Sequence, residues 1–236
     1  FIGGNVVTMF EDAFAAYQGA TNCVGVGNGT DALEIAIEAL DLAPDSEVIV
    51  PANSFVASSE AVTRQGLTPV FCDVSESDYL ADFDDVERKI SSKTSALMVV
   101  HLYGQPCHMT RAVELAERFS LRLIEDCAHS PGAKYKNKLV GNFGDFGCFS
   151  LDNNKLLASG EGGVLVTNNY DNYQKAILLS DFGSRLYKDI KSLKYRKFIQ
   201  TGLGTKYRIH FLAAKLANEK LKNIRIPILV MHGKKD

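Results

Sequence analysis

The chain has 236 residues, of which 46% are hydrophobic and 23% are charged, and its formal net charge at pH 7 is -2. This composition is typical of a globular protein with a sizeable core, in one large domain or two small ones. The charge, and the lack of a run of five or more lysines or arginines, argue against nucleic acid or an anionic membrane as the main partner. No hydrophobic run approaches the roughly 18 residues of a membrane-spanning helix, so we expect no membrane partner.

Five cysteines lie scattered in apolar segments, without a Cys-x-x-Cys pair. Because their number is odd, we predict buried free thiols in a reducing compartment. The first residues, FIGGNVVTMF, lack the basic region and long apolar core of a signal peptide, so we expect a cytoplasmic protein. The chain opens on Phe1 and enters an amphipathic segment almost at once, so we also expect upstream sequence.

Six apolar segments have the length and composition of strands. Most are apolar enough to be covered on both faces, which is typical of parallel strands. The predicted strands are Asn22 to Val26, Glu47 to Val50, Thr68 to Asp73, Ala96 to His101, Leu121 to Asp126 and Gly163 to Thr167.

Segments with apolar residues at helical spacing separate these strands, with Thr30 and Ser54 as the predicted caps of the first two. The alternation predicts an α/β protein whose mostly parallel sheet carries helices on both faces. The basic stretch Ser184 to Lys197 is expected to be a long surface excursion or a solvated helix face. The predicted helices are Thr30 to Leu40, Ser54 to Thr63, Asp82 to Ile90, Thr110 to Phe119, Tyr170 to Leu179 and His210 to Leu221.

Ligands of open α/β sheets bind beyond the carboxyl ends of the strands. The first predicted strand leads into GVGNGTDAL, Gly25 to Leu33, where small residues precede a helix whose first amides could hold a phosphate. The third glycine of the dinucleotide pattern G-x-G-x-x-G is replaced by Thr30, which argues against a nicotinamide cofactor. The turn is therefore either an anion site or an ordinary tight turn with an N-cap.

Two later strand ends supply further candidates. The segment PANSFVAS places Phe55 near the start of a helix, where it is either a core residue or a stacking surface. The segment IEDCAHSPGA places Asp126 at a strand end, as a helix cap, metal ligand or phosphoacceptor, and His129 three residues beyond. No His/Cys/Asp cluster with ligand spacing accompanies them, so we predict no metal site.

Lys155 lies in FSLDNNKLLASGEGG, between a strand-like apolar run and a Gly-Glu-Gly-Gly turn. A lysine amine that is partly withdrawn from water has a lowered pKa and can attack a carbonyl to form a Schiff base. The alternative is an ordinary surface lysine. A single ligand that is flat, phosphorylated, basic at one position and carbonyl-bearing would suit all the candidates, and pyridoxal 5'-phosphate (PLP) has these four properties.

With these residues in place, the sequence also resembles a known family, the DegT/DnrJ/EryC1/StrS aminotransferases. Its members use PLP and act on keto sugars attached to nucleotides. The resemblance implies a fold type I large domain, a mostly parallel mixed sheet with helices on both faces, formed by residues 1–223. The family's N-terminal segment and C-terminal small domain would then lie outside the chain. The matching segments keep the family order over about residues 9 to 220 and include VGNGTDALEIAIEAL, VIVPANSFVASSEAV, LIEDCAHSPGA, FGDFGCFSLDNNKLLASGEGG and GTKYRIHFLAA.

The resemblance also assigns roles to individual residues. Lys155 would form the Schiff base with the cofactor and, once released, move a proton as general acid and base. Asp126 would pair with the ring nitrogen and so keep the ring an electron sink. Ser150, together with Gly29 and Thr30, would bind the phosphate.

The resemblance assigns further residues to contacts with the cofactor ring and with a second subunit. Phe55 would stack on the ring, and His129 would orient the cofactor near the ring hydroxyl. The family motif G-x-N-x-R completes the site of a second subunit, which implies a homodimer. In this motif Lys206 replaces the asparagine and would meet a phosphate as a point charge.

The activity implied by the resemblance is transfer of an amino group from glutamate or glutamine to a nucleotide-linked keto sugar, for cell-surface polysaccharide or secondary metabolites. Family members that dehydrate sugars have histidine in place of the lysine, so Lys155 favours transamination. The residues before Lys155 are polar, so a second interpretation remains open. In this interpretation the protein has the same fold but is catalytically inactive, and it binds sugar nucleotides or has a regulatory role. A nicotinamide-dependent enzyme is the other alternative.

Residues 224–236 depart from the family pattern. The sequence RIPILVMHGKKD is either a generic strand and turn, or it resembles the strand and His-Gly turn near the acid residue of α/β-hydrolases, as a fusion or frameshift would produce. No Gly-x-Ser-x-Gly motif occurs in the chain, which argues against a hydrolase.

Overall fold

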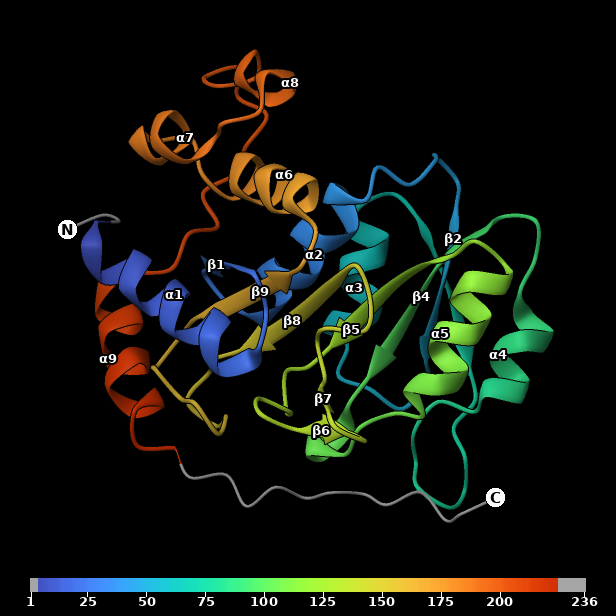
Figure 1. The fold of residues 1–236 in the computed structure, drawn as a ribbon. Coiled ribbons are helices and arrows are strands. Elements are labelled where there is room, and N and C mark those ends of the chain that lie inside the picture. Colours follow the sequence, from blue (N-terminus) through green and yellow to red (C-terminus); the bar gives the residue numbers. More distant parts are fainter. Residues whose placement is uncertain (1–3, 225–236) are drawn as a thin grey trace.

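The computed structural model describes residues 4–224 and contains a central seven-stranded sheet with helices on both faces (Figure 1). Neighbouring strands of this sheet are parallel except for the two pairs that involve β9, so the predicted α/β fold with a mostly parallel mixed sheet is confirmed. In spatial order the strands are β1 (Asn22–Val26), β9 (Gly163–Thr167), β8 (Phe146–Ser150), β5 (Arg122–Asp126), β4 (Thr94–Val100), β2 (Glu47–Pro51) and β3 (Thr68–Cys72).

Helices pack on both sides of this sheet and bury it. The helices of one face are α2 (Gly29–Ala39), α3 (Ala57–Arg64) and α6 (Tyr170–Ser180). Those of the other face are α1 (Asn5–Gln18), α9 (Phe211–Leu221), α4 (Phe83–Lys89) and α5 (Met109–Arg118). The shorter elements are the 3-10 helix η1 (Leu102–Gly104), α7 (Ser184–Asp189), α8 (Leu193–Arg196) and a small hairpin of β6 (Lys134–Tyr135) and β7 (Lys138–Leu139).

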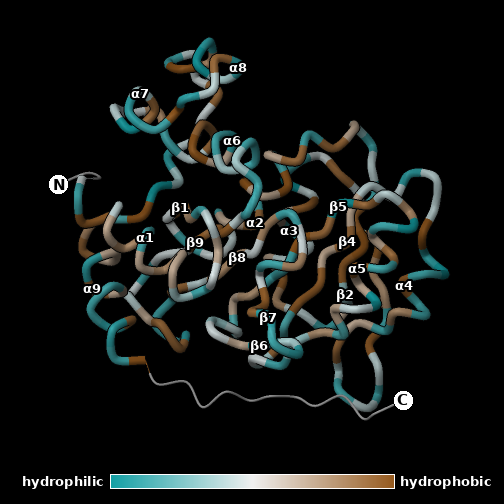
Figure 2. Tube along the Cα trace, in the orientation of Figure 1, coloured by the Kyte–Doolittle hydropathy of each residue, from teal (hydrophilic) through white to brown (hydrophobic). Residues whose placement is uncertain are grey.

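The central strands are apolar because both of their faces are covered. In β4, Ala96 and Met98 belong to the core beneath α2 and α3, whereas Leu97 and Val99 belong to the core beneath α4 and α5. Hydrophobic residues accordingly run along the strands of the sheet in Figure 2. The alternation follows from the two-residue period of a strand, and it places polar functional groups at strand ends rather than within strands.

The structure contains every predicted strand and helix, but both predicted caps are wrong. The cap of α2 is Asn28, whose extended backbone lets its side chain accept the Asp31 N–H at 2.9 Å. Helix α3 begins only at Ala57, without a side-chain cap, and the Ser54 hydroxyl instead lies 2.7 Å from that of Ser58.

Strand β8, which lies near the centre of the sheet, is the strand-like apolar run noted before Lys155, although it is not among the six strands predicted with bounds. Its sequence, FGCFS, has two phenylalanines, which favour a strand, but no β-branched residue and one glycine, so its strand propensity is mixed. All five of its residues are buried, so packing against the neighbouring strands and helices supports the strand at every position.

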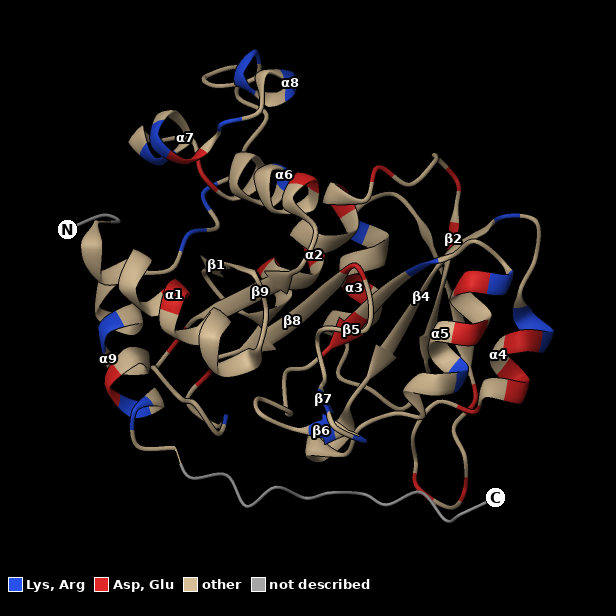
Figure 3. Cartoon of the chain, in the orientation of Figure 1, with Lys and Arg blue, Asp and Glu red and all other residues tan. Residues whose placement is uncertain are grey.

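The basic stretch predicted at the surface forms α7 and α8, and the blue segments on these helices in Figure 3 show its lysines and arginines. One of its cations, Arg185, has a side chain that is only 16% exposed. It donates to both carboxylate oxygens of Glu11 at 2.8 and 2.9 Å and also pairs with Asp189. The prediction of a surface excursion is therefore wrong for Arg185, because this ion pair ties α7 to α1.

All five cysteines are free and buried, as predicted. Burial raises the pKa of the Cys72 thiol to about 12. No helix within residues 4–224 is both long and apolar enough to span a membrane. The expectations for the tail from 225 onwards lie outside the described residues.

Candidate functional site

The carboxyl ends of five strands, β1, β2, β4, β5 and β8, meet at one cavity of about 970 Å³. Because parallel strands end at the same edge of a sheet, residues that lie far apart in the sequence come together there. The cavity is lined by seven of the eight predicted site residues, namely Gly29, Thr30, Phe55, Asp126, His129, Ser150 and Lys155.

The first turn of α2 forms one wall of the cavity. The amides of this turn have no intrahelical acceptors and carry partial positive charge. A Cβ atom on Gly29 would lie 2.9 Å from the Ser150 Cβ, so glycine is required for Ser150 to pack against this turn. Thr30 and Ser150 thus add two hydroxyls to a helix N-terminus, an arrangement suited to a phosphate.

A second close approach keeps Ser150 in place. Ser150 pairs with Gly163 in the ladder between β8 and β9. A Cβ atom on Gly163 would lie only 2.1 Å from the carbonyl oxygen of Asn28. The last glycine of the Gly-Glu-Gly-Gly turn therefore lets the start of β9 pass directly beside the cap of α2.

Asp126 is held from both sides at the end of β5 and is only 6% exposed. Its Oδ1 accepts the Ala128 N–H at 3.1 Å, and its Oδ2 accepts the Ser58 hydroxyl at 2.8 Å. The Ser58 oxygen lies 2.7 Å from that of Ser54. Since a carboxylate only accepts, Ser58 donates its proton to Asp126, and Ser54 donates to Ser58.

His129 is oriented by its contacts with Tyr103. The two rings are stacked, with centroids 5.7 Å apart and planes inclined by 2°. The Tyr103 backbone N–H donates to His129 Nδ1 at 3.2 Å, so in the neutral ring the proton is on Nε2. Burial, and then the positive charge of Lys155, lower the pKa of His129, so its imidazole is neutral near pH 7.

Phe55 is 72% exposed, so it is not a core residue. Its position after β2 brings the ring to the cavity, while its carbonyl oxygen accepts the Ser58 N–H at 3.1 Å. The interpretation of Phe55 as a core residue is therefore wrong, and its role as a stacking surface stays a prediction.

Lys155 is half-buried in a turn that follows β8. Its amide donates to the Asp152 carbonyl at 2.9 Å, and the Asp152 carboxylate accepts the Asn154 N–H at 3.1 Å. The Asp152 amide in turn contacts the Ser150 hydroxyl at 3.3 Å. The polar residues before Lys155 thus hydrogen-bond within their own turn, which keeps Lys155 on the same wall as Ser150.

Lys206 is the predicted site residue that does not line this cavity, and it is exposed. The next residue, Tyr207, lines it instead, and its hydroxyl donates to Glu34 at 2.9 Å. Within one chain, the motif that contains Lys206 therefore reaches the cavity through Tyr207.

The cavity wall is acidic. Arg64, one of the cations that line it, forms ion pairs with Glu34 at 3.3 Å and with Glu60 at 3.2 Å. Burial raises the pKa of Asp31 to about 6, and the neighbouring Glu34 charge adds to this. The lining acids are Asp31, Glu34, Glu60, Asp126, Asp152 and Glu161, against the two cations Arg64 and Lys155.

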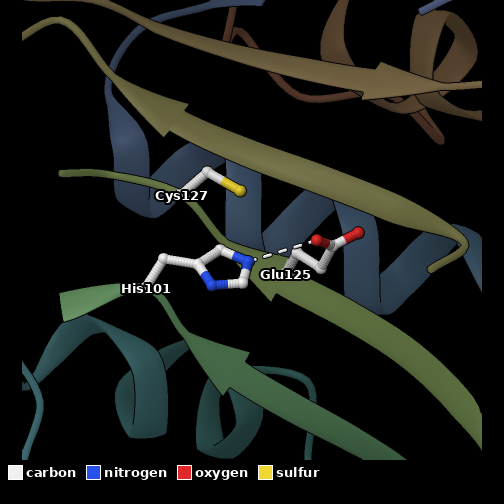
Figure 4. A group of neighbouring side chains, drawn as sticks. All are labelled: His101, Glu125 and Cys127. Carbon is white, nitrogen blue, oxygen red and sulfur yellow. Dashed lines mark hydrogen bonds and ion pairs between the residues drawn. The ribbon is translucent and has the colours of Figure 1, made fainter. Parts of the chain in front are cut away.

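Three buried side chains next to Asp126, namely His101, Glu125 and Cys127, have ligand atoms within 4.8 Å of one another (Figure 4). His101 Nδ1 accepts the Cys107 N–H at 3.0 Å, so Nε2 carries the proton and donates to Glu125 at 3.1 Å.

The Glu125 carboxylate has further protein donors. It accepts the amides of Gly141, Phe143 and Gly144 at 2.6 to 2.9 Å. Burial raises the pKa of Cys127 well above its ordinary value, which opposes the thiolate that a metal would need. Hydrogen bonds within the protein therefore account for this group without a metal ion.

Ser58 and Tyr103 are absent from the predicted site. Tyr103 follows the end of β4, so the strand-end rule could have found it. Ser58 lies inside a helix, and its contact with Asp126 spans 68 positions, so no local sequence pattern reveals it.

The chain is similar to known proteins both in sequence and in fold. The family model for the DegT/DnrJ/EryC1/StrS aminotransferases matches residues 1–228. GDP-perosamine synthase of Escherichia coli O157:H7 is 38% identical over 219 residues, which are 93% of this chain and 58% of that protein. The dTDP-3-amino-3,6-dideoxy-alpha-D-galactopyranose transaminase of Aneurinibacillus thermoaerophilus is 39% identical over 222 residues, 94% of this chain and 58% of that protein.

Among solved structures, an aminotransferase from Psychrobacter cryohalolentis superimposes with a TM-score of 0.86 and 34% identity, covering 93% of this chain and 56% of that one. The chain belongs to the DegT/DnrJ/EryC1/StrS aminotransferase family, whose members depend on PLP. It spans somewhat more than half the length of the relatives described, and the family match runs to residue 228, past the domain boundary predicted at 223.

Proposed function

We propose that the protein to which this chain belongs is a PLP-dependent aminotransferase that moves an amino group from glutamate or glutamine to a nucleotide-linked keto sugar. The observation that carries this proposal is that Lys155, Asp126 and Ser150 line the same cavity. The two relatives above are named for a GDP sugar and a dTDP sugar, which supports this class of substrate. Residues 1–223 would form the cofactor-binding domain.

Several groups that line the cavity match chemical groups of PLP. The first turn of α2 with Thr30 and Ser150 suits its phosphate, and the anchored carboxylate of Asp126 suits its ring nitrogen. The exposed ring of Phe55 offers a surface for stacking. These groups line one cavity, so a single ligand could contact them all.

The chemistry that PLP supplies when bound is an electron sink beside the substrate carbon that loses a proton. Lys155 would hold the cofactor through its Nζ and, when displaced by the amino donor, would carry that proton as base and return it as acid. Asp126 would remain negative and hold a proton on the ring nitrogen. His129, neutral and with its proton on Nε2, would donate a hydrogen bond to a ring oxygen.

We further propose a homodimer in which a second copy supplies cations to this acidic cavity. The cavity lining has six acids and two cations, one of which, Arg64, is already paired. The stretch 184–206 carries six exposed cations, Lys188, Lys191, Lys194, Arg196, Lys197 and Lys206. Charge complementarity therefore favours contact between this stretch of one copy and the cavity of the other.

The five free buried thiols favour a reducing compartment, so we also propose a cytoplasmic location, which cell fractionation would test. The polar turn before Lys155 motivates the alternative, a protein of this fold that binds sugar nucleotides without catalysis.

Cofactor loading separates the two functions. After incubation with PLP and removal of the unbound cofactor, the purified chain should retain a visible absorbance band that Lys155→Ala lacks. Exposed Lys93→Gln serves as the matched control. A wild-type chain that shows no such band would contradict the proposed enzyme. Binding of a sugar nucleotide without the band would favour the non-catalytic alternative.

A further inference from the structure

Ser58 is joined to two different groups of the cavity. Its hydroxyl donates to Asp126 Oδ2 at 2.8 Å, and its backbone N–H donates to the Phe55 carbonyl at 3.1 Å. Ser58 is only 2% exposed, so solvent has little access to replace these bonds. One residue therefore fixes both the carboxylate and the segment that carries the exposed aromatic ring.

The hydroxyl of Ser58 is also the middle of a directed chain. Ser54 lines the cavity and donates to Ser58, which donates to Asp126. A hydrogen bond to a carboxylate favours its ionised form, and bonds to charged acceptors are stronger than neutral ones. The chain therefore orients the Asp126 carboxylate.

This contact differs from the usual behaviour of a helical serine. Serine and threonine within helices commonly bond to carbonyls of the preceding turn. The neighbours of Ser58 in α3 do so, since Ser59 donates to the Val56 carbonyl at 3.1 Å and Thr63 to the Glu60 carbonyl at 2.9 Å. Ser58 alone among these three bonds to a different element, at the end of β5.

We propose that Ser58 is a positioning residue for the cofactor: through the chain from Ser54, it holds the Asp126 carboxylate in the orientation that pairs with a pyridine nitrogen. This inference rests on the proposed function, because the nitrogen belongs to PLP. It predicts that the contribution of Ser58 to binding depends on that ring nitrogen.

The test compares two ligands, PLP and its 1-deaza analogue, in which a CH group replaces the ring nitrogen. Dissociation constants are measured by equilibrium dialysis for the wild type, Ser58→Ala, Ser54→Ala and Ser59→Ala. Ser58→Ala should weaken PLP binding roughly tenfold or more, as expected for loss of a hydrogen bond to a charged group, and should change analogue binding by less than about twofold.

Ser54→Ala should weaken PLP binding less than Ser58→Ala does, and it too should leave binding of the analogue nearly unchanged. This second variant keeps the test decisive if Ser58→Ala does not fold. Ser59→Ala, at a half-buried position of the same helix that does not line the cavity, should bind both ligands like the wild type. An equal loss for both ligands in the Ser58 and Ser54 variants, or no loss in either, would overturn the positioning role while leaving the proposed function intact. A wild type that binds no PLP would overturn both.

Discussion

Asp126 illustrates how much a single residue depends on neighbours that are distant in sequence. Its location at a strand end is readable from the apolar run before it, and the strand-end rule selects it as a candidate. The sequence leaves open a cap, a metal ligand or a phosphoacceptor. Its hydrogen bond to Ser58 depends on how α3 packs beside β5, which no local pattern encodes.

Asp31 provides a test of electrostatics at the residue scale. Burial raises its pKa to about 6 from the ordinary 3.8, so the folded chain binds this proton more tightly than the unfolded chain. The folded state is then favoured at low pH, and this stability is lost as the pH rises from about 4 to 6.

The variant Asp31→Asn cannot ionise, so it does not lose stability as the pH rises, and its amide oxygen keeps a hydrogen-bond acceptor at this position. Its unfolding free energy relative to the wild type should rise by roughly 1 kcal/mol across this pH range, allowing for solvent screening, and then level off. Urea unfolding at a series of pH values measures the difference. A difference that stays flat from pH 4 to 7 would show that the Asp31 pKa is not raised.

At the scale of elements, periodicity and composition predict the strands and helices well, because most strands are covered on both faces and so are uniformly apolar. They give no bounds for β8, whose FGCFS sequence is a strand-like run with mixed strand propensity and is buried at all five positions. They also misplace the start of α3, because Ser54 resembles a cap but its hydroxyl contacts Ser58. The close approach of Gly29 to Ser150 is likewise a product of packing.

Glu125, at the end of β5, connects this strand to the segment 141–144, and its contribution to stability can be tested. Its buried carboxylate accepts three amides of the segment 141–144 and the proton of His101. Glu125→Gln replaces one carboxylate oxygen, which accepts hydrogen bonds, with an amide NH₂ group, which donates them. This NH₂ group would then face the backbone and His101 N–H donors. We expect a loss of about 3 kcal/mol or more of unfolding free energy, since buried donors lose their partner.

The matched control for this change is Glu114→Gln on the exposed face of α5, where the ion pair with Arg111 at 3.4 Å should contribute less than about 1 kcal/mol. Thermal and urea unfolding of both variants give the comparison. Equal stability of the two variants would mean that Glu125 does not hold the segment 141–144 in place.

For the whole molecule, the net charge of -2 conceals an uneven distribution. Acids gather in the cavity lining, while exposed cations gather on the stretch 184–206, where Figure 3 shows the blue segments of α7 and α8. Composition alone cannot predict this separation, because it depends on which strand ends converge. It is the basis for the proposed homodimer.

Sedimentation velocity tests that assembly. At low salt the 25.8 kDa chain should sediment as a species of twice its mass, and added salt should weaken the association. The double variant Lys197→Gln with Lys206→Gln should dimerise less readily than the exposed control Lys93→Gln. A monomer at every concentration and salt level would contradict a dimer formed by this chain.

The central claim is that Lys155 is the residue that holds PLP, and chemical trapping tests it most directly. The chain is incubated with PLP, reduced with borohydride, digested and mapped by mass spectrometry. We predict a phosphopyridoxyl group on the peptide that contains Lys155, and its loss in Lys155→Ala. Absence of the modification, or equal labelling of exposed lysines such as Lys206, would contradict the assignment.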